Sequence, residues 1–173
     1  MHCYCMYCTT AKCEFVAESL TAMGFGRAIM PKIVQRKWVK GTAREEVHSY
    51  LPGYVFLYSD APVSDFLAIR RLTDVHRILG NEADRYELQG SDRAFAEMLL
   101  ASDGTIGILK AYEAGDRVHL DGSLFGDFEG VITKFDRSRR RAEIEFDFDG
   151  KKQRVWCGIE LITDVRKDAE PSI

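Results

Sequence analysis

Apolar and polar positions along the first hundred residues follow both of the periods that regular secondary structure produces. Short apolar runs or strict alternation indicate strands, whereas apolar residues three and four apart indicate amphipathic helices. The continuous aromatic run from Tyr54 to Tyr58 is typical of a strand in the centre of a sheet. Strands are predicted at 2–8, 27–39, 43–49, 54–58 and 75–79, with a turn at 40–42, and helices at 9–23, 64–72 and 91–100.

The order of these elements predicts an α+β fold, in which an N-terminal α/β sandwich has helices on one face of a mainly antiparallel sheet. Pro52-Gly53 predicts the turn before the aromatic strand, and Gly24 is expected to end the first helix. Polar side chains that accept hydrogen bonds from helix N–H groups precede each helix. The predicted N-caps are Thr9 or Thr10, then Ser64, and then Ser91 or Asp92.

After residue 103 the pattern changes. No helix is predicted beyond Gly115, and short alternating strands recur between turn signals at Asp121-Gly122, Asp136-Arg137-Ser138 and Asp149-Gly150. About fifty residues of this pattern predict a small five-stranded β-barrel. The expected organisation is an N-terminal domain at 1–103, a linker at 104–113, and a barrel with a short C-terminal tail at 114–173.

Composition fits a globular protein, with 46% hydrophobic and 29% charged residues. No apolar run approaches the roughly 18–20 residues that span a bilayer, and the N-terminus lacks the pattern of a signal peptide, so a cytoplasmic monomer is expected. The formal net charge is −3. Binding to nucleic acid would therefore be local, or would depend on a protein partner.

Five cysteines raise the question of a metal site. Cys3, Cys5 and Cys8 lie close together, but strand alternation places Cys8 on the other face from the first two. Cysteine is also among the most readily buried residue types. Buried thiols are therefore favoured over a metal site, and disulfides are not expected in a reducing compartment.

No enzyme signature is present in the sequence. It contains no phosphate loop, no HExxH and no GxSxG motif, and its four histidines are scattered. We therefore expect neither catalytic residues nor a cofactor.

Basic residues concentrate in two places, the predicted hairpin near Trp38 and the last turns of the barrel. Such clusters suit RNA phosphates and unpaired bases. The alternative is a solvated charged surface, because acidic residues such as Asp136 and Glu143 lie among them. The candidates are Lys32, Arg36, Lys37, Lys40 and Arg44 in the hairpin, and Lys134, Arg137, Arg139, Arg140, Arg141, Lys151, Lys152 and Arg154 in the barrel.

Three segments in order resemble the bacterial NusG family over nearly the whole chain. CYCMYCTTAKCEFVAESL is similar to the family's opening strand and helix, LPGYVFLYSD to its internal turn and aromatic strand, and GDRVHLDGSLFGDFEGVITKFDRSRRRAEIEF to a KOW motif. Within the family, KIVQRKWVKGTAREEVHSYLPGYVF is closer to specialised paralogues such as LoaP or RfaH.

The resemblance implies a transcription elongation factor or processive antiterminator that binds RNA polymerase. Its N-terminal domain would seat an apolar cavity on a coiled-coil tip of the largest subunit, with Tyr4, Tyr54, Phe56 and Ile78 as candidates. Ser64, in the loop after the aromatic strand, would touch the opposite jaw. Without the resemblance, Tyr54 and Phe56 would be assigned to packing under the helices.

For the barrel, the resemblance implies contact with nascent RNA, such as a leader hairpin, or with a protein partner. Relatives use an apolar pair at one turn to bind ribosomal protein S10 or termination factor Rho. Here the turn is Phe148-Asp149-Gly150, which leaves S10 as a candidate and argues against Rho. The alternative function is an RNA- or ribosome-binding KOW protein without polymerase binding.

Overall fold

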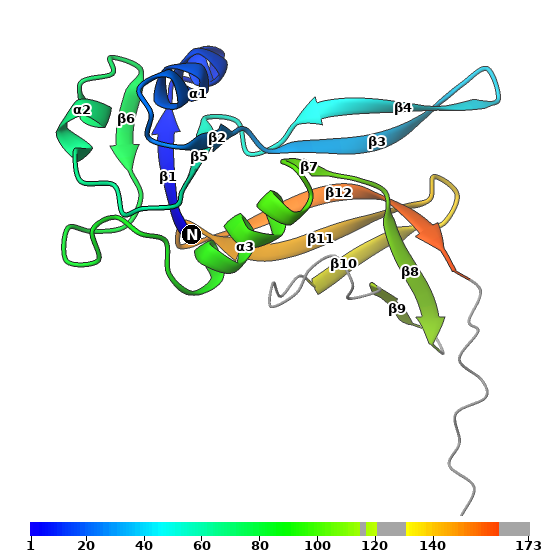
Figure 1. Cartoon of the computed structure of the whole chain (residues 1–173). Helices are drawn as coiled ribbons and strands as arrows, with labels where there is room; N and C mark the ends of the chain where they lie inside the picture. Colours follow the sequence, from blue (N-terminus) through cyan, green and yellow to red (C-terminus); the bar gives the residue numbers. More distant parts are fainter. Residues whose placement is uncertain (115–116, 121–130, 163–173) are drawn as a thin grey trace, which may run out of the picture.

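The computed structural model describes residues 1–114, 117–120 and 131–162. Its N-terminal part is a four-stranded sheet with helices on both faces, not on one as predicted (Figure 1). The sheet has the order β2 (Arg27–Ile29), β5 (Tyr54–Ser59), β1 (His2–Cys8), β6 (Val75–Ile78). The short η1 (Thr10–Lys12) leads into α1 (Cys13–Ala22), which covers one face together with α2 (Phe66–Arg70), and α3 (Gly90–Ala101) covers the other.

A long hairpin, which we call the hairpin arm (residues 32–49), extends from this body (Figure 1). It consists of β3 (Lys32–Val39) and β4 (Thr42–Ser49), and the short β7 (Thr105–Ile106) pairs with the base of β3. The single strand predicted at 27–39 is interrupted at Pro31, which has no N–H to donate to a ladder. As a result β2 pairs with β5, whereas β3 belongs to a separate sheet.

The C-terminal part is a five-stranded sheet, which we call the barrel. Its order is β10 (Val131–Asp136), β11 (Arg141–Phe148), β12 (Lys151–Leu161), β8 (Leu109–Ala114), β9 (Arg117–Leu120). The two edge strands β9 and β10 approach each other, so the sheet nearly closes, which confirms the predicted barrel. The turn predicted at Asp121-Gly122 lies outside the described residues.

Helix starts differ from the predicted caps. The second helix is capped by Asp65, whose carboxylate accepts a hydrogen bond from the Ala68 N–H, and not by its neighbour Ser64. The third helix begins at Gly90 with Gln89 at the N-cap position and no side-chain cap, and the Asp92 carboxylate, inside the first turn, accepts a hydrogen bond from the barrel. Thr9 makes no side-chain cap bond either.

The two parts of the molecule share one hydrophobic core. One cluster runs from a face of the N-terminal sheet through α3 into the barrel, while a second cluster lies under α1 and α2. The Tyr58 hydroxyl ties the sheet to α3 by donating to the Ala96 carbonyl at 2.7 Å. The segment predicted as a linker contains β7 and most of β8, so regular structure connects the parts.

All five cysteines are buried thiols, as predicted. Cys3 and Cys5 belong to the core that extends into the barrel, whereas Cys8 and Cys13 lie on the α1 side of the sheet. The described part of the chain holds no cluster of side chains that could bind a metal ion. Among the same residues, every helix is too short or too polar to cross a membrane.

Candidate functional site

The aromatic strand β5 presents Tyr54 and Phe56 on the sheet face that α3 and the barrel cover. The preceding turn is fixed by Gly53, which has φ +94° and whose added Cβ would come within 2.8 Å of the Tyr7 ring. Only glycine fits there. The close approach sets Tyr54 against Tyr7, with ring centroids 5.1 Å apart, and Tyr7 is 38% exposed at the rim.

Phe148 of the barrel fills the space over this aromatic face. Its side chain is fully buried, and its ring lies 5.3 Å from Tyr54, 5.5 Å from Phe56 and 5.2 Å from Phe95 of α3. Phe146, two residues earlier on the same face of β11, stacks on Phe95 with an interplanar angle of 8°. The barrel therefore occupies the surface that the sequence assigned to a partner.

A polar contact closes the edge of this aromatic cluster at Asp149. The Tyr54 hydroxyl donates to the Asp149 carboxylate at 2.9 Å, and the Arg77 guanidinium binds both carboxylate oxygens, one of them at 3.1 Å. The backbone N–H of Asp149 donates to the Asp92 carboxylate of α3 at 3.0 Å. Every group of this contact comes from a different element, so it fixes the barrel against the N-terminal domain.

The backbone conformation of this turn positions the Asp149 side chain. Asp149 and Gly150 have φ +53° and +67°, the left-handed pair of a two-residue hairpin turn. We call Phe148–Lys151 the Asp149 turn. Aspartate tolerates this conformation better than most residues, so one side chain both shapes the turn and binds Tyr54 and Arg77.

Burial shapes the protonation of these groups. Burial, and then the hydrogen bond to Asp149, raises the pKa of Tyr54 well above its usual value, so the hydroxyl stays a donor at neutral pH. The hydrogen bond with Asp149 raises the pKa of Arg77. Burial raises the pKa of Asp92, opposed by the N–H that Asp149 donates to it.

Tyr50, at the interface between the barrel and the N-terminal domain, differs from these groups in its hydrogen bonding. Its ring lies 6.1 Å from Phe146, and burial raises the pKa of its hydroxyl. Among the described residues the Tyr50 hydroxyl finds no hydrogen-bond partner, although it is buried. An unpaired buried hydroxyl costs free energy.

The other residues predicted to bind polymerase lie elsewhere. Tyr4 and Ile78 are buried on the α1 side of the sheet, opposite Tyr54 and Phe56, so the four do not form one cavity. The Tyr4 hydroxyl accepts a hydrogen bond from Val63 at 3.1 Å and so anchors the loop that carries the exposed Ser64.

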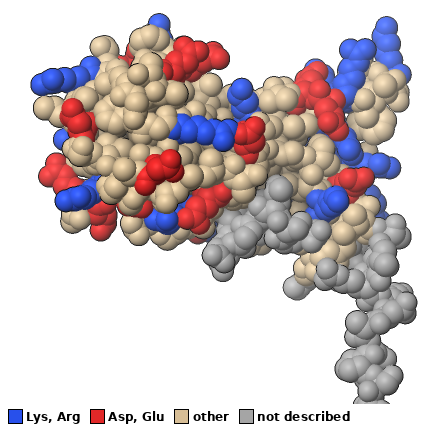
Figure 2. All heavy atoms as spheres, in the orientation of Figure 1, with Lys and Arg blue, Asp and Glu red and all other residues tan. Residues whose placement is uncertain are grey.

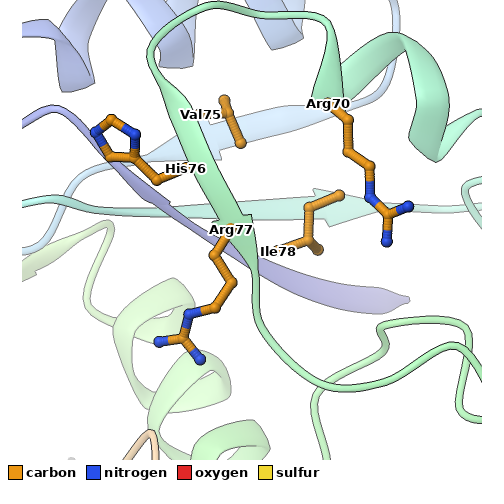
Figure 3. A pocket seen from close by; sticks show the side chains of 5 residues that line it. All are labelled: Arg70, Val75, His76, Arg77 and Ile78. Atoms are coloured by element: carbon orange, nitrogen blue, oxygen red, sulfur yellow. The ribbon is translucent and has the colours of Figure 1, made fainter.

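Ile78 lines a hollow along the edge strand β6 (Figure 3). The hollow has a volume of about 330 Å³. Arg77 belongs both to this hollow and to the Asp149 contact, so the two features adjoin. Its other lining residues are Arg70, Val75 and His76.

The basic residues predicted to bind RNA separate into two groups. Lys151 belongs to the Asp149 turn and Lys152 follows it, whereas residues 137–140, which we call the arginine turn, lie at the far end of β11 (Figure 1). The hairpin arm extends toward the same far end (Figure 1). Carboxylates neutralise part of the basic charge of the hairpin arm and of the barrel, in the pairs Arg36–Glu45, Lys37–Glu46, Lys134–Glu143, Arg139–Asp136, Arg141–Asp136, Lys152–Glu145 and Arg154–Glu145.

Comparison with known proteins identifies the family. A family model described as transcription termination factor nusG matches residues 1–97, more than half of the chain. The chain belongs to the NusG family. Among solved structures, it is similar to the one described as "Domain interaction in Thermotoga maritima NusG", with a TM-score of 0.53 and 18% identity over 91% of this chain and 93% of that one. At that identity the likeness shows a shared fold. No curated protein matched the chain.

Several residues of the NusG-family site were missed by the sequence analysis. Alternation along β1 places Tyr7 on the face of Cys3 and Cys5, beside Tyr54, so this neighbour could have been predicted. In the sequence analysis, Phe148 and Asp149 are considered only as a turn for an external partner, and Asp92 only as a helix cap. The remaining members, which are not named there, are Arg77 and Phe95.

Proposed function

We propose that this NusG-family protein is a transcription elongation factor that binds RNA polymerase through its N-terminal domain and suppresses pausing or termination. The resemblance to LoaP and RfaH supports a processive antiterminator, recruited to particular operons. The barrel would contact nascent RNA or a protein partner. The expected docking partner is the coiled-coil tip of the largest polymerase subunit.

The observation that carries this proposal is the aromatic face of Tyr54 and Phe56 with its polar rim. Large aromatic side chains surrounded by hydrogen-bonding groups are typical of the centre of a protein interface. In this structure the face is covered by Phe148, a side chain from the protein's own barrel. A surface that already accepts an apolar ring from one partner is suited to accept another.

The cover has a direct consequence for binding. Phe148 and an external partner cannot occupy the same space over Tyr54. Polymerase binding through this face therefore requires the barrel to move away, and the closed form described here competes with it. Asp149, engaged with Arg77, supports an internal use of the turn and argues against Rho as its partner. Ribosomal protein S10 stays a candidate partner of the opened barrel.

The test measures capture of the full-length protein by immobilised core RNA polymerase. Phe148→Ser combined with Asp149→Ala should open the barrel and raise capture by about tenfold or more when the closed form dominates. Adding Tyr54→Ala to that variant should reduce capture again. Tyr54 is chosen because Phe56 is fully buried against Phe95, and its truncation would disturb the core.

Trp38→Ala in the opened variant is the matched control, since it removes an exposed aromatic ring remote from the face. It should leave capture unchanged, and circular dichroism should confirm that each variant is folded. Failure of both wild-type and opened protein to bind polymerase would contradict the proposal. Co-purification with ribosomal subunits would then favour the alternative, an RNA- or ribosome-binding protein.

A further inference from the structure

The hairpin arm and the arginine turn concentrate positive charge in an acidic protein. Residues 32–49 hold five basic and two acidic side chains, and residues 134–141 hold five basic and one acidic. The chain as a whole has a formal net charge of −3. These two segments therefore carry a net charge of about +7 and the remainder about −10, a polarity that would orient a polyanion toward them. Figure 2 shows Lys and Arg side chains gathered at this end of the molecule.

Strand β12 links the hairpin arm to the arginine end of the barrel through contacts with both. The Gln35 side-chain amide of the hairpin arm donates to the Trp156 carbonyl of β12 at 3.1 Å. On the Trp156 ring lies the Arg141 guanidinium, 4.5 Å from the ring centroid. One residue of the barrel thus contacts both the hairpin arm and the first arginine after the turn. At Gly158 an added Cβ would lie 3.8 Å from the Val34 carbonyl, so the two strands approach closely.

Within the hairpin arm, the register places two like charges opposite each other. Lys37 lies directly opposite Arg44 in the β3–β4 ladder, on the same face as Gln35 and hence toward the barrel side. Like charges directly opposite each other destabilise a sheet. Glu46 approaches Lys37 at 3.8 Å and His48 at 3.5 Å, and among the described residues no carboxylate pairs with Arg44. A bound anion would remove this repulsion.

Some cations have no internal partner. Within the described ranges, no carboxylate pairs with Lys40, Arg44 or Arg140, and all three side chains are exposed. The turn that carries Arg140 is nevertheless well ordered by backbone bonds, since the Arg140 carbonyl accepts from the Ile159 N–H at 2.8 Å. Exposed, unpaired cations on a fixed backbone are available to neutralise the phosphates of a nucleic acid.

We infer that the hairpin arm and the arginine turn are two sides of one site for single-stranded RNA, which is complete only when the barrel is docked. Phosphates would lie along Lys37, Arg44 and Arg140. Trp38, half exposed at the tip of the arm, offers a ring for an unpaired base, which favours a single strand over a duplex or an acidic protein. The inference rests on the proposal that the barrel contacts RNA, and it is independent of polymerase binding.

The test titrates full-length protein into a fluorescein-labelled 20-nucleotide oligouridylate at several salt concentrations. Two pairs of substitutions, Lys37→Gln/Arg44→Gln and Arg139→Gln/Arg140→Gln, remove two charges each. For one composite site, each pair should weaken binding about tenfold with the stoichiometry still one, and reduce the salt slope by about 1.4. Lys12→Gln/Arg71→Gln removes the same charge from exposed positions on η1 and just beyond α2, and should have little effect.

Docking is tested with the opened variant, Phe148→Ser/Asp149→Ala. Separating the two sides should weaken RNA binding several-fold in this variant. Two bound RNA molecules per protein, with one lost at unchanged affinity in each charge variant, would overturn the inference while leaving RNA binding intact. Equal affinity for polyglutamate, or no RNA binding at all, would also overturn it. None of these outcomes depends on polymerase capture, which is measured separately.

Discussion

Strand β11 joins two turns that use similar backbone geometry for opposite purposes. Both contain a non-glycine residue with positive φ, Arg140 at +49° and Asp149 at +53°. At one end the Asp149 turn inserts into the N-terminal domain, and its charge is bound by Arg77. At the other end the arginine turn is exposed and has more cations than nearby carboxylates. The difference lies in the side chains, which bury one turn against the N-terminal domain and leave the other exposed to solvent.

The strongest test of this comparison removes the apolar part of the buried turn. Phe148→Ala should lower the free energy of unfolding by about 3–5 kcal/mol, because a fully buried ring in contact with three aromatic residues is replaced by a cavity. Urea unfolding followed by fluorescence measures the loss. Phe15→Ala, at a position 58% exposed on α1, is the control and should cost little. A loss below about 1 kcal/mol from Phe148→Ala would show that the turn is not part of the core.

A smaller effect should follow from neutralising the polar part of the same turn. Asp149→Asn keeps a residue that tolerates positive φ and removes the charge that Arg77 binds. The free energy of unfolding should fall by only about 1 kcal/mol, because solvent screens the ion pair at the half-exposed Arg77. Combining Asp149→Asn with Arg77→Gln should cost little more than either change alone. Full additivity in this double-mutant cycle would exclude an energetic coupling between the two residues.

The smallest effect belongs to the exposed turn and depends on pH. Hydrogen bonds from the Ser138 hydroxyl and the Arg139 N–H lower the pKa of Asp136 from 3.8 to about 2. Folding therefore favours the ionised carboxylate. Its stabilisation is present above the unfolded value and is lost as the pH falls through about 2. Asp136→Asn should flatten this part of the acid unfolding curve, and Ser138→Ala should do so partly. Identical acid profiles for wild type and Asp136→Asn would contradict this role.

Much of the fold could be predicted because local patterns determine it. The aromatic run from Tyr54 to Tyr58 has one plausible structure, a central strand, and the alternation of Cys3, Cys5 and Cys8 places them on the correct faces. Helix caps were harder to predict. Ser64 and Asp65 are adjacent and both are of residue types that commonly cap helices, and only the three-dimensional path of the loop selects Asp65.

Docking of the barrel could not be predicted from the sequence. Phe148 is apolar, and such a residue fits the interior of the barrel, a partner's surface or the N-terminal domain equally well. Asp149 forms an Asp-Gly turn in every case, so its bonds to Tyr54 and Arg77 leave no local signature. The grouping of Tyr4 with Tyr54 failed for a related reason. Tyr4 and Tyr54 lie on different strands, and whether they face the same side of the sheet depends on the register between these strands. The sequence alone does not give that register.

The buried, unpaired hydroxyl of Tyr50 destabilises the closed arrangement. Because it lies beside Phe146 at the junction, movement of the barrel would return this oxygen to water. Rehydrating a buried unpaired hydroxyl recovers about 1–3 kcal/mol, which corresponds to a change of roughly 5–150-fold in an equilibrium constant. The aromatic contacts favour the closed arrangement, and the unpaired Tyr50 hydroxyl opposes them by this amount.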